Sequence, residues 1–399
     1  MYRLLVLKRI LENIILFPFI LLGRLFALMK PLKKEYNVFF FFPFYHTGGA
    51  ENVHAQISKA TGGSNSIILF TRKSADSRYM IQFQDSKCDI KNISAFTDNK
   101  WLYFLNLIFR GIISGYINKQ KKKTIVFNGQ CNFGYKLSPW VKKNITQVEL
   151  IHSFNSFSYI RIPFIQFYRK TIMISRKSIE DHRLLYNRYR IPEVYFENIT
   201  YIQNGISISK YEQIKKEANN KLTVLYSGRG SKEKRIHLFA QIAQVINTQF
   251  PEIQFEILGD VSNYLDISNF SFIKFWGNQF DDEKINSIYQ NANILLLTSD
   301  TEGFPLVIME AMAASCAIIS TPIGDIPLHI RNEENGFLLQ SVTNEKLIIE
   351  ESVSFILRLH REKELLNQIA NTNFIYAQAK FGLKDFKTAY RNLFSDLKN

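Results

Sequence analysis

Short apolar runs that end in glycine recur along the second half of the chain, and they constrain its fold more than any other feature of the sequence. Three such runs, each with the glycine that follows it, are residues 222–227 with Gly228, residues 252–258 with Gly259 and residues 272–276 with Gly277. Stretches with helical periodicity, such as residues 236–247, lie between them. Continuous apolar strands that alternate with helices are typical of a parallel sheet covered on both faces. The second half therefore predicts an α/β domain built from βαβ units.

The first half repeats this alternation. Residues 38–44 (VFFFFPF), 66–70, 124–128 and 148–152 are apolar runs typical of buried strands. A chain of 399 residues is too long for one hydrophobic core, so two domains are expected. In such sheets, ligands bind beyond the carboxyl ends of the strands. We therefore predict an α/β fold of two Rossmann-like domains that face each other across a cleft, with the functional site in that cleft.

Changes in composition set the domain limits. A polar, lysine-rich stretch follows residues 202–206 (IQNGI) and separates an N-terminal domain, residues 35–203, from a C-terminal domain, residues 204–375. Residues 1–34 are a separate, mostly apolar segment. Residues 376–399 are predicted to be a C-terminal helix whose course can cross back to the first domain.

The positive charge of the chain is confined to its first half. The sequence has 50 Lys+Arg against 35 Asp+Glu, a net charge of +15. Residues 1–200 contain 30 basic and 12 acidic residues, a net +18, whereas residues 201–399 contain 20 and 23, a net −3. This asymmetry favours an anionic partner for the first domain: nucleic acid, anionic lipid or a phosphorylated substrate.

Residues 1–34 favour lipid among these partners. The longest run without a charge, residues 14–23, has ten residues, whereas a spanning helix needs about twenty. Pro18 is expected to kink a helix here. An in-plane amphipathic anchor with basic flanks fits better than a signal peptide, because no small-x-small cleavage site follows; a helix packed on its own domain is the other alternative. The basic residues within and after this segment are Lys8, Arg9, Arg24, Lys30, Lys33 and Lys34.

Cysteine usage points to a reducing compartment. Cys88, Cys131 and Cys316 are isolated and form neither a disulfide framework nor a metal-ligand pattern. The chain contains no Asp-x-Asp, and no His/Cys/Asp cluster has the spacing of metal ligands. We therefore expect a cytoplasmic protein without a metal or other cofactor.

The most specific chemical motif begins at Glu302 and ends at Glu310. Pro305 suits the first turn of a helix, and the backbone N–H groups of Gly303 and Phe304 would then be available to an anion. Each carboxylate can accept hydrogen bonds from hydroxyl groups, as in a ribose or another sugar. The motif predicts a site for a sugar that carries a phosphate.

The flanks of this motif resemble a known family. Residues 299–325 (SDTEGFPLVIMEAMAASCAIISTPIGD) closely resemble the E-x7-E segment of glycosyltransferase family 4, the group 1 glycosyltransferases. The other segments that resemble this family, in the same order, are residues 46–51 (HTGGAE), 202–206 (IQNGI), 227–229 (SGR) with Lys234, 258–260 (LGD), 276–277 (WG) and 335–338 (NGFL). The resemblance covers about residues 38–395, and nearly all of its specificity lies in the C-terminal half.

The resemblance implies a GT-B fold in which residues 204–375 bind a donor nucleotide-sugar and residues 35–203 face the acceptor. Arg229 and Lys234 would stabilise the leaving diphosphate, since two cations suit developing negative charge. The residues that the resemblance places at the donor are Gly48, Gly49, Arg229, Lys234, Gly277, Glu302, Gly303, Phe304, Pro305, Leu306 and Glu310. Glu310 would bind the ribose and Glu302 the donor sugar.

Histidine is the remaining candidate for chemistry. His152 ends the run VELIH, and the family carries a histidine near this place that faces the acceptor and the transferred sugar. An imidazole there could transfer a proton or orient a hydroxyl, although a structural role at the strand end is equally compatible with the sequence. The role of His46 stays open. We assign catalysis to His152, Glu302, Arg229 and Lys234.

Two departures from the family pattern affect the donor side. The family's Lys-Gly is Lys234-Arg235 here, and residues 324–328 read GDIPL where the family has a second glycine and then Pro-Glu. These differences put the fine donor geometry in question more than the fold.

The function that the sequence predicts is a retaining glycosyltransferase of the hexosyltransferase type that needs no metal. It would move a sugar from a UDP- or GDP-sugar to a glycan or lipid-linked acceptor, in surface polysaccharide or lipopolysaccharide biosynthesis, and attach peripherally to the inner face of the cell membrane. The resemblance implies a same-face mechanism in which the leaving phosphate helps to deprotonate the acceptor. Two alternatives are a nucleotide-sugar epimerase of the same fold and a non-catalytic basic protein that binds membrane or nucleic acid; the lysines lack the aromatic interleaving of a nucleic-acid surface.

Overall fold

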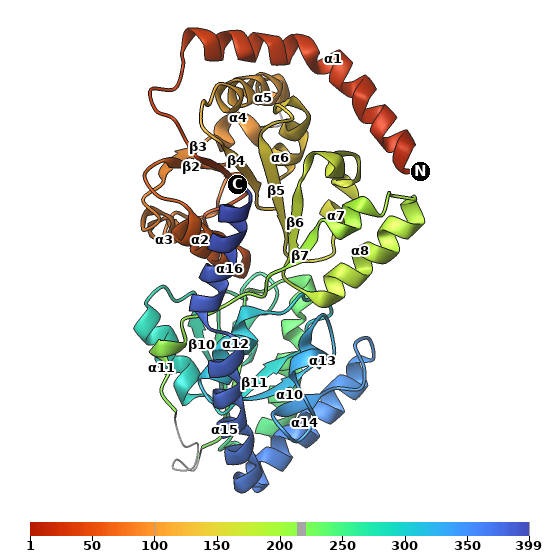
Figure 1. Ribbon diagram of the computed structural model, residues 1–399. Helices are drawn as coiled ribbons and strands as arrows, with labels where there is room; N and C mark the ends of the chain where they lie inside the picture. Colours follow the sequence, from red (N-terminus) through yellow and green to blue (C-terminus); the bar gives the residue numbers. More distant parts are fainter. Residues whose placement is uncertain (100, 214–220, 399) are drawn as a thin grey trace. The chain divides into compact units, whose positions relative to one another are not determined.

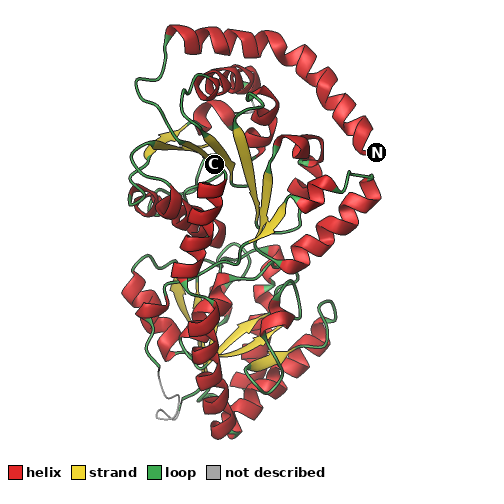
Figure 2. Cartoon of the chain, in the orientation of Figure 1, coloured by secondary structure: helices red, strands yellow, loops and turns green. Residues whose placement is uncertain are grey.

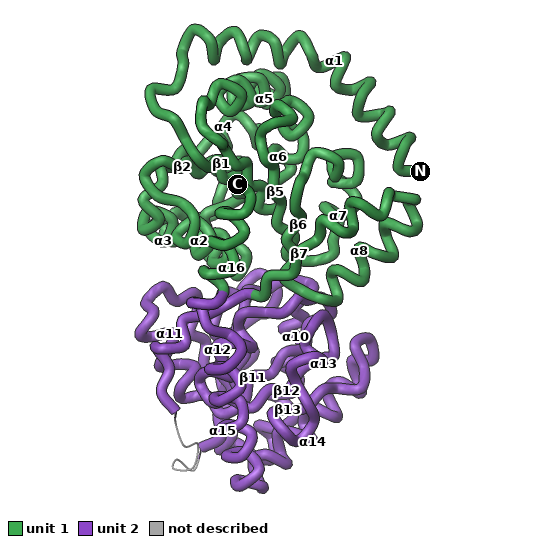
Figure 3. Tube along the Cα trace, in the orientation of Figure 1, with its two compact units in different colours: residues 1–203, 386–399 green, residues 204–385 purple. Residues whose placement is uncertain are grey.

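The computed structural model describes residues 1–99, 101–213 and 221–398, and the chain divides into two compact units (Figure 3). Unit 1 comprises Met1–Gln203 and Phe386–Asn399, and unit 2 comprises Asn204–Asp385. The units meet in sequence at Gln203, where composition places the domain limit. Most of the lysine-rich stretch used to locate that limit, from residue 214 on, lies outside the described residues.

Unit 1 is built on a parallel sheet of seven strands in the order β3-β2-β1-β4-β5-β6-β7 (Figure 1). The strands are β1 Val38–Phe42, β2 Ser66–Phe70, β3 Asp89–Asn92, β4 Ile125–Asn128, β5 Thr146–Ile151, β6 Lys170–Met173 and β7 Ile199–Tyr201. Every residue of β1 is buried, because both of its edges are paired: Val38 is opposite Ser66 on one side and Ile125 on the other. Phe39 and Phe41 belong to the hydrophobic cluster on one face of the sheet, whereas Phe40 contacts Phe394 and Phe42 contacts His54.

Helices flank the sheet of unit 1 (Figure 2). They are α1 Tyr2–Met29, α2 Gly49–Thr61, α3 Met80–Gln84, α4 Ser94–Thr97, α5 Tyr103–Asn118, α6 Asn132–Leu137, α7 Ser156–Ile160, α8 Arg176–Tyr189, α9 Val194–Glu197 and α16 Leu383–Asp396, with short 3₁₀ turns at Ser138–Trp140 and Ile162–Phe167. The last helix joins this unit through Phe394, whose ring lies 6.3 Å from that of Phe40 and 5.8 Å from that of Phe127. The end of the chain thus packs on the first core.

Helix α1 packs along α5 with the two backbones in direct contact (Figure 1). A Cβ on Gly23 would lie 2.1 Å from the carbonyl oxygen of Ile108, and one on Gly111 would lie 2.3 Å from that of Ile20. Ala27 lies against Gly115 in the same seam. Such small-residue contacts are the means by which two strongly apolar helices approach closely.

The polar side chains of α1 differ from the expected arrangement. Arg9 is buried and donates a hydrogen bond to the carbonyl of Pro163 at 2.6 Å, and Arg24 donates to that of Trp140 at 2.8 Å. Both arginines therefore bind their own unit and are not part of a basic flank. Pro18 lies inside a continuous helix, and α1 is long and apolar enough to cross a membrane by length and composition.

Unit 2 repeats the architecture with a parallel sheet of six strands in the order β10-β9-β8-β11-β12-β13. The strands are β8 Thr223–Ser227, β9 Gln254–Leu258, β10 Ile273–Gly277, β11 Ile294–Leu297, β12 Ala317–Ser320 and β13 Gly336–Leu338. The helices are α10 Ile236–Asn247, α11 Asp282–Asn291, α12 Leu306–Ala313, α13 Ile326–His329, α14 Glu345–Arg361 and α15 Lys363–Lys380, with 3₁₀ turns at Ile208–Lys210, Lys232–Lys234 and Ile267–Asn269. Two parallel sheets with this alternation confirm the predicted α/β fold of two Rossmann-like domains.

The glycines that punctuate the second half have a common role at the carboxyl edge of this sheet. Gly259 has φ +124°, and a Cβ there would lie 2.1 Å from the carbonyl oxygen of Gly228. Its N–H donates to the carbonyl of Gly277 at 2.9 Å, and the N–H of Gly228 donates to that of Leu258 at 2.9 Å. Three strand ends are thus joined through residues that have no side chain, which leaves this edge open to ligands.

The sequence missed β3 and β13, which are two of the four edge strands. The first is DIKN, with no buried residue, and the second has only three residues. An edge strand is paired on one side only, and where it is also polar or very short its sequence lacks the continuous apolar run that identifies a central strand.

Candidate active site

In both sheets the strand order reverses at one point, between β1 and β4 in unit 1 and between β8 and β11 in unit 2. Ligands of open α/β sheets bind outside the carboxyl ends of the strands at such a point. Each unit therefore has one place where functional side chains are expected, and we describe the two places separately.

In unit 2, the segments that leave β8 and β11 are joined to each other. The N–H of Asp300 donates to the carbonyl of Glu233 at 2.9 Å, and the Thr298 hydroxyl donates to that of Arg235 at 3.2 Å. The turn with Lys234 and the loop that leads to Glu302 are consequently held side by side at the switch point.

Lys234 and Glu302 form an ion pair at this place. The ammonium group contacts Glu302 Oε1, and the two side chains are 19% and 11% exposed. The sequence assigned the lysine to the diphosphate and the glutamate to the sugar, and the structure brings them together. A pair this sheltered is screened only weakly, so an incoming anion must compete with Glu302 for the lysine.

Arg229 is more exposed than Lys234. Its side chain is 68% exposed, and its guanidinium lies 3.8 Å from Glu233 Oε1. Its main-chain carbonyl accepts a hydrogen bond from the Tyr226 hydroxyl at 3.1 Å, which fixes the backbone of the turn. An exposed pair of this kind contributes little, so the guanidinium can exchange this partner for a phosphate at small cost.

Arg235 occupies a backbone conformation that usually suits glycine. Its φ is +46°, in the left-handed region, at the position where the resembled family has glycine. The side chain is buried and donates three hydrogen bonds, to the carbonyls of Thr298 at 2.7 Å, Val342 at 2.6 Å and Ser299 at 3.1 Å. These bonds offset the strain and fasten the Lys234 turn to the segment that follows β11.

Glu310 lies in the second turn of α12 and has a buried partner that the sequence did not reveal. The Tyr289 hydroxyl lies 3.1 Å from Glu310 Oε2 and 2.8 Å from Ser227 Oγ. Because a phenol has one proton, Tyr289 donates it to the carboxylate and accepts the proton of Ser227. Burial raises the pKa of Glu310 above its ordinary value. The tyrosine leaves the other carboxylate oxygen to a ligand.

At the loop before α12, backbone groups and not side chains are available to a ligand. Phe304 is buried and stacks on His329 with ring centroids 4.1 Å apart, so its side chain belongs to the core. Pro305 is the N-cap and Leu306 the first helical residue, one position later than predicted. Gly303 is held from behind, because its carbonyl accepts the N–H of Asp325 at 2.8 Å. Leu306 directly follows the N-cap, so its N–H lies in the first turn of α12, where N–H groups have no partner within the helix.

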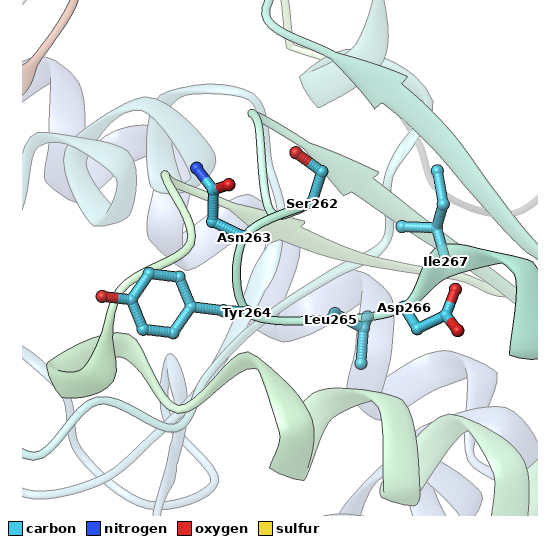
Figure 4. Close-up of a pocket in the computed structure, with 6 residues that line it drawn as sticks. All are labelled: Ser262, Asn263, Tyr264, Leu265, Asp266 and Ile267. Carbon is cyan, nitrogen blue, oxygen red and sulfur yellow. The ribbon is translucent and has the colours of Figure 1, made fainter.

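Two features of unit 2 lie beside this place. Gly277 ends the edge strand β10, which is separated from β8 by β9. Its carbonyl accepts the N–H of Gly259 and so joins the ends of β9 and β10. A hollow formed by the loop after β9 contains no predicted site residue; it is lined by Ser262, Asn263, Tyr264, Leu265, Asp266 and Ile267 (Figure 4). Of the side chains described, none forms a group of three or more His, Cys, Asp or Glu that could hold a metal ion.

In unit 1, the Gly-Gly loop connects β1 to α2, with Gly48 as N-cap and Gly49 as the first helical residue. Gly48 has an extended backbone that any residue can adopt, so its conformation does not require a glycine. Space is the reason, because a Cβ there would lie 2.2 Å from Glu51 Oε2. The same buried glutamate lies 3.7 Å from His46 Nε2, which ties His46 to this loop.

His152 follows β5 and lies against a second histidine that the sequence did not single out. Its main-chain N–H donates to Gln130 Oε1 at 3.0 Å. Its ring Nε2 lies 2.9 Å from Nε2 of His54 in α2. Burial lowers the pKa of His152 to about 4. The imidazole is therefore neutral at physiological pH and, as a weak base, is better suited to hydrogen bonding than to proton transfer.

Comparison with known proteins agrees with this geometry. Residues 207–372 match the family model of the group 1 glycosyl transferases. The capsular polysaccharide biosynthesis glycosyltransferase CapM of Staphylococcus aureus is 25% identical over 188 residues, which cover 42% of this chain and 50% of CapM. The 2-deoxystreptamine N-acetyl-D-glucosaminyltransferase of Niallia circulans is 23% identical over 63% of this chain and 67% of its own length. The matched stretch thus spans about half the length of the first of these relatives.

Solved structures extend the likeness to nearly the whole chain. Anabaena HepE, crystallised with UDP and glucose, has a TM-score of 0.72 at 16% identity and covers 90% of this chain and 100% of its own. The lipopolysaccharide outer core galactosyltransferase WaaB has a TM-score of 0.65 at 19% identity, over 90% and 99% of the two chains. The fold is therefore the GT-B fold, and residues 207–372 match the family model of the group 1 glycosyl transferases.

Proposed function

We propose that this chain is a retaining glycosyltransferase of family 4 that uses a UDP- or GDP-sugar and needs no metal. Its acceptor would be a glycan or a lipid-linked glycan in surface polysaccharide or lipopolysaccharide biosynthesis. The observation that carries the proposal is the convergence of Lys234, Glu302 and Glu310 at the switch point of the domain that matches the group 1 family.

Each group of unit 2 has a role in binding the donor. Glu310, oriented by Tyr289, accepts hydrogen bonds from the paired hydroxyls of the ribose. Glu302 binds hydroxyls of the transferred sugar. The N–H groups of Gly303 and Leu306, at the N-terminus of α12, face negative charge on the diphosphate.

Lys234 and Arg229 stabilise the leaving group. As the bond between the anomeric carbon and the phosphate oxygen breaks, charge builds on the diphosphate, and these two cations are placed to neutralise it. This supports a reaction without a metal, since the protein itself supplies the positive charge. The acceptor oxygen bonds to the anomeric carbon on the same face, and its proton passes to the departing phosphate oxygen. His152 orients the acceptor hydroxyl.

The named relatives support the class of donor and of pathway. The structural neighbour HepE was crystallised with UDP and glucose, and CapM is named for capsular polysaccharide biosynthesis. A UDP-sugar is accordingly the first donor to test.

We also propose that unit 1 attaches peripherally to the inner face of the cell membrane. With Arg9 and Arg24 turned inward, the exposed side of α1 is apolar from residue 14 on, whereas Arg3, Lys8 and Glu12 are exposed nearer its start. Helix α5, which packs along α1, begins within an exposed apolar segment. The exposed apolar residues of α1 and of this segment include Leu4, Leu7, Leu11, Ile14, Ile15, Leu22, Leu25, Leu28, Met29, Trp101, Leu102, Tyr103 and Phe104. Large exposed apolar patches of this kind mark interaction surfaces.

Basic residues border this apolar surface. Lys119 donates to the carbonyl of Ala27 at 3.2 Å, so the C-terminal ends of α1 and α5 lie together. Exposed lysines follow both ends, at Lys30 and Lys33 and at residues 121–123. An apolar face with lysines at its margin is complementary to an anionic lipid surface.

Donor binding and turnover test the enzymatic proposal. UDP- and GDP-sugars should raise the melting temperature of the protein, and less so in Lys234→Ala and Glu310→Ala. Lys346→Ala, whose side chain is 85% exposed in the same unit, is the matched control. Mass spectrometry should then detect transfer to a glycan or lipid-linked acceptor. No response to any nucleotide-sugar would refute the proposal, and sugar conversion without an acceptor would favour the epimerase.

Liposome sedimentation tests the attachment. Leu22→Glu should weaken binding to vesicles that contain anionic lipid, because a charge would enter the apolar face. Leu184→Glu, at a leucine of α8 that is 68% exposed, should bind like the wild type. Equal binding by both variants would contradict the role of α1.

A further inference from the structure

The imidazoles of His54 and His152 share one proton in the hydrogen bond between them. His54 Nε2 and His152 Nε2 are 2.9 Å apart, and the rings meet edge to face with centroids 4.8 Å apart. Both rings are neutral, since burial lowers both pKa values. One Nε2 must then carry hydrogen and the other must present its lone pair. The assignment of this proton decides what His152 offers to a ligand.

The surroundings of His54 settle which ring donates. His54 is 1% exposed, and its Nδ1 is buried with no hydrogen-bond partner in the part of the chain that the structure describes. If His54 accepted at Nε2, its proton would lie on Nδ1 as a buried N–H without an acceptor. Orphaned buried N–H groups are rarer in proteins than unsatisfied lone pairs. His54 therefore carries its proton on Nε2 and donates.

The ring of His54 is also held in one orientation. It stacks on Phe42 of β1 with centroids 4.3 Å apart and planes 14° from parallel. Gly129, which follows β4, leaves the space for it, since a Cβ there would lie 2.6 Å from His54 Nε2 and 2.7 Å from the Phe42 ring. The switch point of unit 1 thus contains a cage for one imidazole, made by the two strands that part there.

We propose that His54 is a positioning residue that donates Nε2–H to His152 Nε2 and so fixes His152 as the Nδ1–H tautomer, with that N–H as the hydrogen-bond donor to the substrate. The substrate contact rests on the proposed function, whereas the tautomer does not. Free histidine favours the opposite tautomer, so the assignment can be tested directly. With its Nε2 lone pair engaged, His152 acts as a donor to a sugar oxygen and not as a general base.

Nitrogen-15 NMR of the full-length protein, labelled at histidine, reads the tautomer without any ligand. The His152 signals, identified by their loss in His152→Asn, should show a protonated Nδ1 and an unprotonated Nε2. In His54→Met, which keeps the bulk but has no donor, the Nε2–H form should gain population. His54→Gln restores an N–H near the same place and should restore the Nδ1–H form. A wild-type His152 with hydrogen on Nε2, or no change in His54→Met, would overturn the proposal.

Kinetics separate this role from a structural one and from failure of the proposed function. If the chain transfers sugar as proposed, kcat should fall about ten- to hundredfold in His54→Met, the range typical of residues that orient a functional histidine, while KM for the nucleotide-sugar stays unchanged. His54→Gln should recover most of the loss. A wild type with the expected tautomer and no transferase activity would refute the function and leave the assignment intact.

Discussion

Both units place polar groups at the point where the strand order reverses, but those of unit 2 are charged and those of unit 1 are neutral. In unit 2, Lys234 pairs with Glu302 and Arg229 pairs with Glu233, on the segments that follow β8 and β11. Unit 1 places His54 and His152, both neutral, against the aromatic core of its sheet. Charges suit a leaving group whose charge changes during reaction, whereas a neutral donor suits a hydroxyl that only needs orientation. The proposed function therefore assigns different chemical tasks to the two units, because the residues after the strands differ.

Removal of Lys234 should produce the largest effect, since it breaks the charged side of this comparison. Lys234→Ala deletes the cation that we propose faces the diphosphate, and it leaves Glu302 partly buried without its partner. We expect kcat/KM to fall by about 10²–10³, as for the loss of one group that stabilises developing charge. Steady-state kinetics beside Lys346→Ala would measure it. A loss below threefold would show that Lys234 does not face the leaving group.

Gly129→Ala should disturb the neutral histidine pair of unit 1. The added Cβ would overlap the rings of His54 and Phe42, which are both buried, so overpacking is expected to cost about 1–3 kcal/mol of unfolding free energy. Gly382→Ala is the matched control, because a Cβ there would lie 3.5 Å from its nearest neighbour. Urea denaturation measures both. Equal stabilities in the two variants would mean that the cage of His54 is not tight.

These two sites also differ in how far the sequence revealed them. Lys234 and Arg229 are five residues apart, and Glu302 and Glu310 lie within one loop and helix, so local spacing predicted the donor side. His54 and His152 are 98 residues apart, and only strand order brings them together. Sequence patterns identify central strands and local motifs because both depend on neighbours in the chain. Pairs created by the fold, including Tyr289 with Glu310, need the structure.

Tyr289→Phe tests the charged site of unit 2 more finely, because it removes a hydrogen bond to Glu310 and leaves the carboxylate in place. The variant loses the hydrogen bond that orients Glu310, which is worth about 1 kcal/mol, so Kd for the donor should rise several-fold. Tyr390→Phe is the control, because among the described residues its buried hydroxyl has no partner. Donor titration by calorimetry would compare them. An unchanged donor affinity would show that Glu310 does not depend on Tyr289.

The smallest expected effect is a difference between the two units in how far acid lowers their stability. Burial lowers the pKa of His54, of His152 to about 4 and of His182 to about 3, and all three lie in unit 1. The unfolded chain, with ordinary imidazole pKa values near 6.5, binds more protons than the folded unit below that pH. The contribution of these histidines to the free energy of unfolding of unit 1 is therefore fully present above pH 6.5, and it declines as the pH falls toward their folded pKa values. In unit 2, burial raises the pKa of Glu310, which acts in the opposite direction.

Hydrogen exchange at a series of pH values, corrected for intrinsic rates, would report the two units separately. Between pH 7 and pH 5, protection of β1 and β5 should fall more than protection of β8 and β11, because the three buried imidazoles lie in unit 1 and the raised pKa of Glu310 acts in the opposite direction in unit 2. His54→Gln should flatten the dependence in unit 1 without abolishing it, since His152 and His182 remain. A parallel decline in both sheets would show that the neutral imidazoles do not set the acid sensitivity of unit 1.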